Sequence, residues 1–468
     1  MLADAGGLMK QAVNHPNLDT MNSQWYKFIK TPADLMFWSA CLLLGSMPTS
    51  PFLLSVGMWG LAAAALWNIA GRLPDKPRFS SLLTWVRALG VSFINLYRQK
   101  ELLLVTLLLL APALSLLWSD DQDYWLRVTR VRLPFLVLPL TFASLPELSE
   151  RRYKMALYIL VWFMVLLCIG VGINFLIHYD EILTGLGRGQ PVPVPRQHVR
   201  FSLILATTII TGGWLWNDRF TVRYQWERGL LGGAVIFLFL FIHVLSVRGG
   251  LAVLYAALLF TVIWYVVRTR RWAMGLTAVV LMGAGLWVAI ENIPSLSMRV
   301  AYMRYDWLQY QSDSGASYSD SERWVSLKTG WKIWQQHPVQ GVGAGDLQQE
   351  VRRVTTEMFP GYAAAPLLPH NQWIHILAST GIIGLLLSIP GFLGLFLKRR
   401  NRSDYLLLTF YTMAFLTFLI ECTIENAVGV AWFLFFPLWF SGIVTKKSAE
   451  AQFPALQRTC SAHYRKKS

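Results

Sequence analysis

The chain has 468 residues, of which 54% are hydrophobic and 15% are charged. Soluble globular proteins carry about 25% charged residues, so this composition excludes an ordinary soluble domain. The formal net charge is +16, but the basic residues stand in short clusters between apolar runs, which argues against nucleic-acid binding and for a membrane protein with basic cytoplasmic loops.

Apolar runs long enough to cross a bilayer recur along the whole chain. We predict an all-α fold, namely a polytopic integral membrane protein with about twelve transmembrane helices and a large helical periplasmic loop. The segment 79–97 carries Trp85, Phe93 and Tyr97 together with Arg87 and, just beyond, Arg98, which favours an interfacial helix over a span. The polar first 33 residues contain Pro16, so we expect the first span to act as an uncleaved signal. The predicted spans are 34–48, 51–70, 102–118, 132–145, 154–177, 201–216, 229–247, 250–267, 272–290, 372–397, 404–424 and 428–445.

The basic clusters fall on alternate sides of successive spans, as a single orientation requires. Cytoplasmic loops are enriched in Lys and Arg, so we place these clusters and both termini in the cytoplasm. The clusters lie at 71–100, 151–154, 268–271, 398–402 and 465–467. The loops predicted to face outward are 119–130, 178–200, the turn at 248–249 and the long stretch 292–371.

Four parts follow from this map. Residues 1–291 form a predicted N-terminal transmembrane bundle of about nine spans, and 292–371 form a large periplasmic loop or cap. Residues 372–445 are the C-terminal transmembrane helices, and 446–468 are a cytoplasmic basic tail. Within the loop, an amphipathic helix is predicted over 322–336, with Trp324, Leu327, Trp331 and Trp334 on one face, followed by a glycine-rich turn at 341–345.

His370 is the first candidate for chemistry, because it follows Pro369 and directly precedes the tenth predicted span. The positive end of a helix dipole disfavours an imidazolium, and a neutral imidazole can act as a general base. The plainer alternative is an amphipathic anchor at the membrane surface. His375 lies five positions on, about 140° around a helix, so we interpret it as a packing residue.

Arginines at the mouths of other spans are the second candidates. Arg248 ends an apolar run and precedes two glycines, which leave backbone room for a ligand; the alternative is a snorkelling anchor. Arg196, His198 and Arg200 alternate after three prolines, so in an extended strand they would share one face. The alternative there is a solvated linker. Guanidinium groups bind phosphate oxygens in bidentate fashion, which suits a phosphate-bearing substrate.

Glu421 and Glu425 close the eleventh predicted span, one turn apart on one helix face. They could pair with the arginines, orient His370 or bind an acceptor hydroxyl, or they could form an ion pair that holds helices together. Four scattered cysteines show no metal-ligand spacing, so no metal site is predicted. The one Asp-x-Asp match, at 121–123, is interpreted as solvated loop charge.

Together these motifs resemble the O-antigen ligase and polymerase superfamily of bacterial inner-membrane glycosyltransferases. In its ligase branch, a His is followed by Asn, Ser or Gln, nine residues, a Gly, two residues, and Gly, Thr or Tyr. The chain matches this pattern from His370 and Asn371 to Gly381 and Gly384. Weaker matches are the Ser-Val-Arg-Gly element at 246–249, with Val247 as an extra residue, Arg200 with Arg196 as a competitor, the loop signature at 322–345, which includes Arg323, and the run 421–429.

The resemblance implies glycan transfer from an undecaprenyl-pyrophosphate-linked donor, with no nucleotide sugar, cofactor or metal. In the ligase branch the acceptor is a sugar of the lipid A-core. We therefore predict a metal-independent, inverting O-antigen ligase among membrane lipids, with no nucleic-acid partner. Arg200 and Arg248 would hold the pyrophosphate, and His370 would deprotonate the acceptor hydroxyl. The predicted substrate-binding residues are Arg196, Asn371, Arg323, Glu421 and Glu425.

Two alternatives lie in the same superfamily: an O-antigen polymerase, with a growing glycan as acceptor, and a protein O-oligosaccharyltransferase. A transporter or flippase is an alternative of a different class. A transporter predicts broken helices and charges near the middle of the membrane, whereas the charges of this sequence gather at one face.

Overall fold

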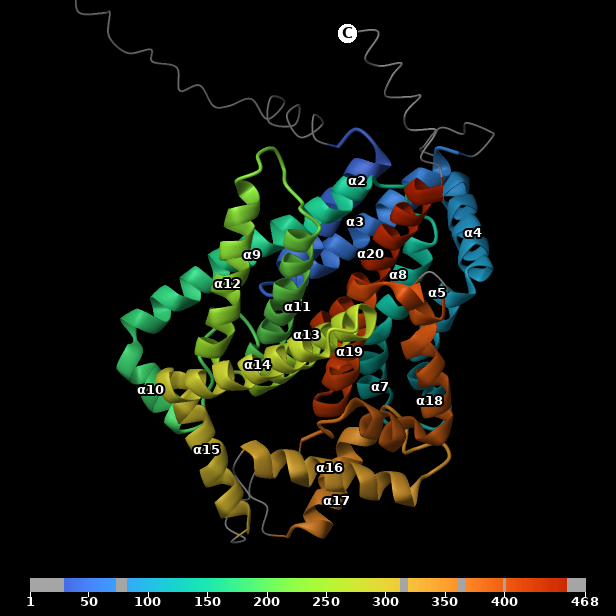
Figure 1. The fold of residues 1–468 in the computed structure, drawn as a ribbon. Coiled ribbons are helices and arrows are strands. Elements are labelled where there is room, and N and C mark those ends of the chain that lie inside the picture. The colour runs from blue at the N-terminus through green and yellow to red at the C-terminus, as the bar shows by residue number, and fades with distance from the viewer. Residues whose placement is uncertain (1–28, 73–81, 312–318, 361–366, 399–400, 453–468) are drawn as a thin grey trace, which may run out of the picture.

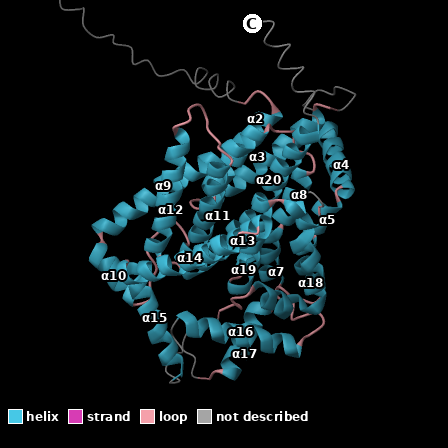
Figure 2. Cartoon of the chain, in the orientation of Figure 1, coloured by secondary structure: helices cyan, strands magenta, loops and turns pink. Residues whose placement is uncertain are grey.

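A computed structural model describes residues 29–72, 82–311, 319–360, 367–398 and 401–452. All regular structure in these ranges is helical (Figure 2). Nine helical segments there are long and apolar enough to cross a membrane, which confirms the predicted all-α polytopic membrane protein. They are α3 (Pro51–Ala70), the run α5 to η1 (Lys100–Leu117), α9 (Glu150–Ile177), α11 (His198–Asn217), α12 (Glu227–Leu245), α13 (Arg248–Thr269), α14 (Trp272–Asn292), α18 (Gln372–Leu397) and α20 (Ala427–Gln452).

Three of the predicted spans are shorter than a full crossing. α2 (Pro32–Ser46) and α19 (Tyr405–Ile420) are apolar helices of 15 and 16 residues. α8 (Pro134–Phe142) has nine residues, about 13 Å of helix, against a hydrocarbon core of about 30 Å. The predicted total of twelve spans therefore stays a prediction. The remaining helices are α4 (Leu82–Arg98), α7 (Gln122–Arg132), α10 (Tyr179–Gly187), α15 (Pro294–Gln311), α16 (Ser319–Gln336) and α17 (Leu347–Met358).

Several predictions fall on residues outside the described ranges. These are Pro16 and the polar start of the chain, residues 73–81 of the first basic cluster, residues 399–400 of the fourth cluster, and the tail beyond residue 452. The segment 119–130, predicted as an outer loop, is mostly helix α7. Asp121 begins that helix by accepting a hydrogen bond from the Tyr124 amide at 2.8 Å, so this carboxylate caps a helix rather than standing free in solvent.

The core is built around α20 and α11. Of their apolar windows, 89% and 78% of the residues are buried, whereas α14 lies at the margin with 6%. A helix that is apolar on all sides is stable inside a bundle, and α20 contributes the buried rings of Trp432, Phe435 and Trp439. The two central helices thereby fix the positions of Arg200, in the first turn of α11, and of the segment 421–426, which leads into α20.

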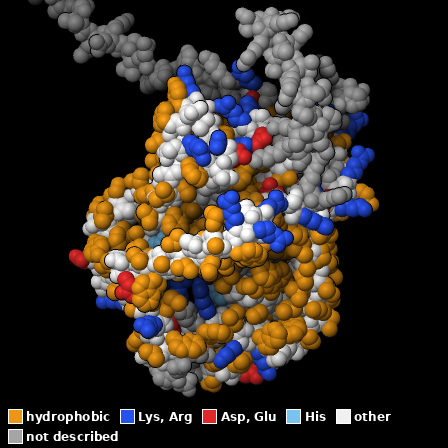
Figure 3. Space-filling model, viewed as in Figure 1, with side chains coloured by type: hydrophobic (Ala, Val, Ile, Leu, Met, Phe, Trp, Pro, Cys, Tyr) orange, Lys and Arg blue, Asp and Glu red, His pale blue; other side chains and the backbone are white. Residues whose placement is uncertain are grey.

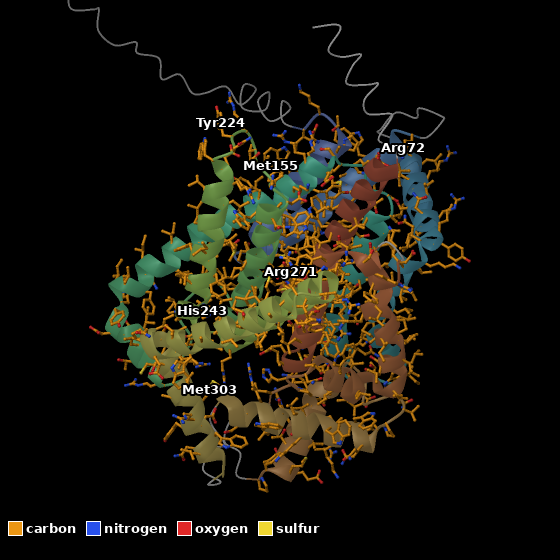
Figure 4. The ribbon with its side chains drawn as sticks, viewed as in Figure 1. Arg72, Met155, Tyr224, His243, Arg271 and Met303 are labelled. Carbon is orange, nitrogen blue, oxygen red and sulfur yellow. The ribbon has the colours of Figure 1, made fainter. Side chains whose placement is uncertain are left out.

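The helices α15, α16 and α17 lie at one end of the molecule, opposite the first turn of α2 and the end of α20 (Figure 1). We call these three helices the cap. The same two ends are marked in Figure 4 by Met303 on α15 and by Arg72 and Tyr224. A small apolar core joins α16 and α17 to α18 through Ile333, Leu347, Val351, Val354 and Ala378.

The predicted helix over 322–336 is present inside α16, but its predicted apolar face is not the buried one. Trp324 and Trp331 are 47% and 45% exposed, whereas Val325, Thr329 and Ile333 are buried. Small side chains make the contact: a Cβ added at Gly330 would lie 2.5 Å from the Pro369 ring. The tryptophans were too large for this close approach and lie at the rim instead.

The helix α18 is broken at Gly381, which has φ +63° and ψ −160°. The cap turn 338–343 occupies the break, because a Cβ at Gly381 would lie 2.2 Å from the Val339 carbonyl oxygen. This explains the glycine in the His motif: only glycine tolerates both the left-handed φ and the contact. The exchanged backbone hydrogen bonds are Val342 N to Ala378 O, Gly343 N to Ser379 O, Ile382 N to Pro338 O and Ile383 N to Val339 O, at 2.8–3.2 Å.

Candidate active site

His370, Glu421 and Arg323 meet just inside the cap. His370 precedes α18, Glu421 follows α19, and Arg323 belongs to α16 of the cap. The His370 Nδ1 lies 3.5 Å from one Glu421 carboxylate oxygen, and Arg323 Nη2 donates to the other at 2.8 Å. The structure therefore brings together three of the predicted site residues. Two of them, Arg323 and Glu421, lie 98 residues apart in the sequence.

The charges of this group determine its protonation. Burial acts to raise the pKa of Glu421, but the contact with His370 and the charge of Arg323 outweigh it and leave the pKa below its usual value. Glu421 is therefore an ionised carboxylate at neutral pH. A proton on Nδ1 of His370 faces this carboxylate, which leaves the lone pair on Nε2. The His370 side chain is 26% exposed, so a substrate hydroxyl can reach it.

Short-range contacts hold His370 in place. Its amide donates to the Ser326 hydroxyl at 3.3 Å. Asn371 caps α18: its side-chain oxygen accepts from the amides of Trp373 and Ile374, and its NH2 group donates to the Leu419 carbonyl at 3.0 Å. The structure thus gives Asn371 a capping role, and its predicted contact with substrate stays a prediction.

The two glutamates do not share a helix face, which corrects the sequence interpretation. α19 ends at Ile420, Glu421 is extended, and a 3₁₀ turn follows at Thr423–Glu425. Glu425 therefore points into a different buried group, where it pairs with Arg132 and accepts from Gln372 at 2.7 Å. Glu421 therefore belongs to the group of His370 and Arg323, and Glu425 belongs to the group of Arg132 and Gln372.

His375 belongs to this second group. Its Nδ1 lies 3.4 Å from the Glu425 carboxylate, and its side chain is 6% exposed. This placement agrees with the prediction that His375 does not share the site of His370. His375 is more than a packing residue, however, because it contacts a buried carboxylate. Gln372 connects the group to the backbone, because its side-chain oxygen accepts from the Ile424 amide at 3.0 Å. The segment 421–425 is thereby fastened to the first turn of α18.

Arg248 lies in a cleft that contains Glu421. Figure 3 shows Lys and Arg side chains inside a hollow of the surface between α14–α15 and α16. We call this space the reaction cleft; its polar lining consists of His198, Ser246, Arg248, Arg299, Arg323 and Glu421. Three guanidinium groups beside one His–Glu pair can bind a diphosphate and leave the imidazole available for proton transfer.

The turn that presents Arg248 is fixed from both sides. Ser246 ends α12 in the left-handed conformation, with φ +51°. One turn before it, the His243 ring contacts the Phe239 carbonyl at 2.8 Å and the Tyr255 hydroxyl of α13 at 2.9 Å (His243 is labelled in Figure 4). Two helices are thus joined next to the arginine, which fixes where α13 begins.

Arg200 approaches Glu421 from another direction. It is 6% exposed, and its Nη2 donates to the carbonyl of Cys422 at 2.8 Å. It lines a second cleft, together with Arg196, beside the turn between α2 and α3. The predicted pair of Arg200 and Arg248 therefore does not line one cleft, although the charge of Arg200 acts on Glu421.

His198 does not lie on one face with Arg196 and Arg200, as the sequence interpretation expected. α11 begins at His198, so the alternation expected of an extended strand ends there. Arg196 and Arg200 line the second cleft, and His198 lines the reaction cleft. Sequence reasoning missed Arg299, which carries no motif, and Arg132, which was taken as the start of a span.

Among the described residues, no group of three His, Cys, Asp or Glu side chains is placed to hold a metal ion. The positive charge of the site comes from its arginines. Residues 233–389 match a family whose description is O-antigen ligase, and this stretch contains Arg248, Arg299, Arg323 and His370. No curated protein matches the chain.

Proposed function

Since residues 233–389 place this multi-pass membrane protein in the O-antigen ligase and polymerase superfamily, we propose that it is an O-antigen ligase. It would move a glycan from undecaprenyl pyrophosphate to the lipid A-core oligosaccharide. The match confirms the family resemblance and an O-antigen ligase or polymerase type of activity. The identity of the acceptor belongs to the proposal.

The observation that carries the proposal is that Glu421, which contacts His370, lines one cleft together with three arginines. Glu421 holds His370 through Nδ1, and Nε2 takes the proton of the acceptor hydroxyl. The acceptor oxygen attacks the anomeric carbon of the donor glycan, and the bond from that carbon to the pyrophosphate oxygen breaks. Attack from the face opposite the leaving group inverts the anomeric centre.

The leaving lipid pyrophosphate takes both electrons of the broken bond. Arg248, Arg299 and Arg323 line the cleft where this charge would develop, and fixed cations stabilise it without reorganisation of solvent. The chemistry is complete without a metal, because the base, the nucleophile and the charge stabilisation are all supplied. His370 returns its proton to solvent after the product leaves.

Arg200 acts in this proposal mainly through the segment that it holds. Its bond to the Cys422 carbonyl fixes the residue next to Glu421, and its charge favours the ionised carboxylate. Glu425 would likewise position the segment through Gln372, rather than bind substrate. Arg196 lies at an exposed position of the second cleft, where a substrate group could still reach it.

The structure contains two features that the transporter alternative predicts, namely a broken span and buried charges. The break in α18, however, is filled by the chain's own turn 338–343, and the buried Glu425 is paired with Arg132. Both features are therefore accounted for by contacts within the described part of the chain. This supports an enzyme over a carrier.

We also propose that the cap faces the periplasm of a bacterial inner membrane and that both termini are cytoplasmic. The first turn of α2 and the last turn of α20 lie at the end opposite the cap, which supports this orientation (Figure 1). Single cysteines at positions 200, 248 and 370 should react with a membrane-impermeant thiol reagent from the periplasmic side. Labelling of any one only after the membrane is opened would separate the three positions.

The function is tested with purified protein in liposomes, a lipid-linked glycan donor and a lipid A-core acceptor. His370→Ala should abolish transfer while the protein stays folded by size-exclusion chromatography, and wild-type transfer by this variant would refute the general-base role. A lipopolysaccharide gel of a deletion strain distinguishes the acceptors. Loss of the whole ladder with donor accumulation supports a ligase, whereas a single-repeat band indicates a polymerase.

A further inference from the structure

One face of α16 lies along the segment that leads into α18. Glu322, Ser326 and Gly330 follow one another at spacings of four residues, so they form one ridge of this helix. The Ser326 hydroxyl accepts a hydrogen bond from the His370 amide at 3.3 Å, and a Cβ at Gly330 would lie 2.5 Å from the Pro369 ring. Glu322 therefore stands one helical turn beyond the Ser326 contact, on the ridge that faces His370.

The half-buried carboxylate of Glu322 interacts with the charge of His370. Burial raises the pKa of Glu322, the charge of a protonated His370 acts to lower it, and the charge of Asp306 on α15 raises it again, so that the pKa ends above its usual value. Electrostatic coupling is reciprocal, so an ionised Glu322 favours the protonated form of His370. Glu421 is not among the described charges that act on Glu322, so the two carboxylates act on one imidazole without forming a pair with each other.

Both sequence neighbours of Glu322 are fixed by side-chain bonds. On one side, the Ser321 hydroxyl donates to the carboxylate of Asp306 at 2.7 Å, and Asp306 is fully buried. On the other side, Arg323 donates to Glu421 at 2.8 Å. These bonds join α16 to α15 and to the end of α19, which restricts the backbone at Glu322. A charge that is held in place stabilises a charge that forms during a reaction without first having to reorganise.

We propose that Glu322 is a positioning residue of the proposed transferase, namely a second carboxylate that favours the imidazolium of His370 while the acceptor hydroxyl loses its proton. The hydroxyl proton passes to Nε2, the electron pair of the oxygen forms the bond to the anomeric carbon, and Glu322 takes no proton in this step. Glu421 holds the ring through Nδ1, and Glu322 adds negative charge from the cap. The inference rests on the proposed function, because it takes His370 as the base.

The first test measures how readily His370 is protonated, without any substrate. Diethyl pyrocarbonate acylates the neutral imidazole, so the pH dependence of its reaction at His370 gives a pH midpoint, read by tandem mass spectrometry on the full-length protein in detergent. The charged groups around this position are Glu322, Glu421, Arg323 and Asp306. Glu322→Gln removes one negative charge, so the midpoint should move to lower pH by about 0.5–1 unit. An unmoved midpoint in this variant would overturn the proposal.

Three further variants separate the charge of Glu322 from its shape. Glu322→Asp keeps the charge and should restore most of the wild-type midpoint. Glu322→Ala removes the charge with a residue that favours helix, so it should give the same shift as Glu322→Gln and replaces that variant if it does not fold. Glu350→Gln is the matched control: it removes a carboxylate from α17 of the cap that pairs with Arg353, and its midpoint should equal the wild type. If Glu322→Asp behaved like Glu322→Gln, or if the control shifted as far, the charge of Glu322 would not be the cause and the proposal would be wrong.

The second test compares transfer rates in liposomes as a function of pH. The kcat of Glu322→Gln at neutral pH should fall about threefold to tenfold, because a weaker base attracts the hydroxyl proton less. The loss should shrink in acid solution, since the weaker base stays neutral to lower pH. An equal loss at all pH values would indicate a structural role and refute the proposal.

The two tests fail independently. A midpoint that moves as expected in a protein without any transfer activity would contradict the function proposed for His370. An unmoved midpoint together with normal transfer would contradict only the role of Glu322.

Discussion

Replacement of Glu421 by glutamine tests how the site prepares its base. The change keeps the shape of the side chain and removes its charge. It therefore removes the charged partner of the His370 Nδ1 at 3.5 Å and of Arg323 at 2.8 Å. A hydrogen bond to a charged group contributes about 1.5–3 kcal/mol. At 3.5 Å the His370 contact is long, so we take the lower part of this range.

A loss of about 1.5–2 kcal/mol of transition-state stabilisation corresponds to a fall in kcat of about 10- to 30-fold. The assay is initial-rate transfer from lipid-linked donor in liposomes, with KM measured alongside. Glu350→Gln is the matched control, because the same chemical change there breaks an ion pair with the half-exposed Arg353, worth about 0–1 kcal/mol. Its kcat should stay at the wild-type value.

The pH dependence gives a second measurement. Because the pKa of Glu421 lies below its usual 4.5, the carboxylate is charged throughout the neutral range. The ratio of wild-type to Glu421→Gln rates should therefore fall toward one as Glu421 itself becomes protonated in acid solution. A wild-type kcat in the variant, or a loss explained entirely by a lower unfolding temperature, would refute the reasoning.

Four further predictions concern single changes. Arg248→Lys should lose most activity although the charge remains, since an ammonium cannot replace the bidentate fork; full turnover would show that charge alone suffices. Gly381→Ala should destabilise the fold by at least about 2–3 kcal/mol, from left-handed strain and the 2.2 Å contact with Val339, and an unchanged thermal unfolding midpoint would count against the inserted turn. Glu425→Gln leaves Arg132 without a buried counter-ion and should lower the free energy of unfolding by about 3–5 kcal/mol, which denaturant titration in mild detergent can check. Treatment with EDTA should leave the transfer rate unchanged, and a rate restored only by added magnesium or manganese would contradict the metal-independent mechanism.

Nine of the predicted spans correspond to long apolar helices among the described residues, because length and hydropathy suffice to define such helices. The helix predicted over 154–177 is α9, which begins four residues earlier at Glu150 after a Ser149 cap. Helix ends were the harder part. Asp121 was not identified as the cap of α7, and the end of α19 before Glu421 was missed because an apolar pattern continues through Cys422 and Ile424.

Site residues were predictable where a local pattern surrounds them, as for His370 before a span or Arg248 before two glycines. Their partners were not, because the contacts are far apart along the chain. Glu425 meets Arg132 from 293 residues away, and Arg200 meets Cys422 from 222 residues away. A single sequence carries periodicity and spacing, but it does not carry the docking of α7 and α11 against the segment before α20.

The turn inserted into α18 limits how this protein can be rebuilt. Its four exchanged hydrogen bonds involve backbone groups of residues 338–343 and 378–383, so no side-chain substitution can supply them. A chimera that takes its cap from another protein must therefore carry this turn and the facing stretch of α18 as one piece. If the cap were simply excised, the broken helix would keep unpaired amides and carbonyls in an apolar setting, at about 1–3 kcal/mol for each group. A protein without the cap would therefore be expected to lose the membrane helix α18 as well.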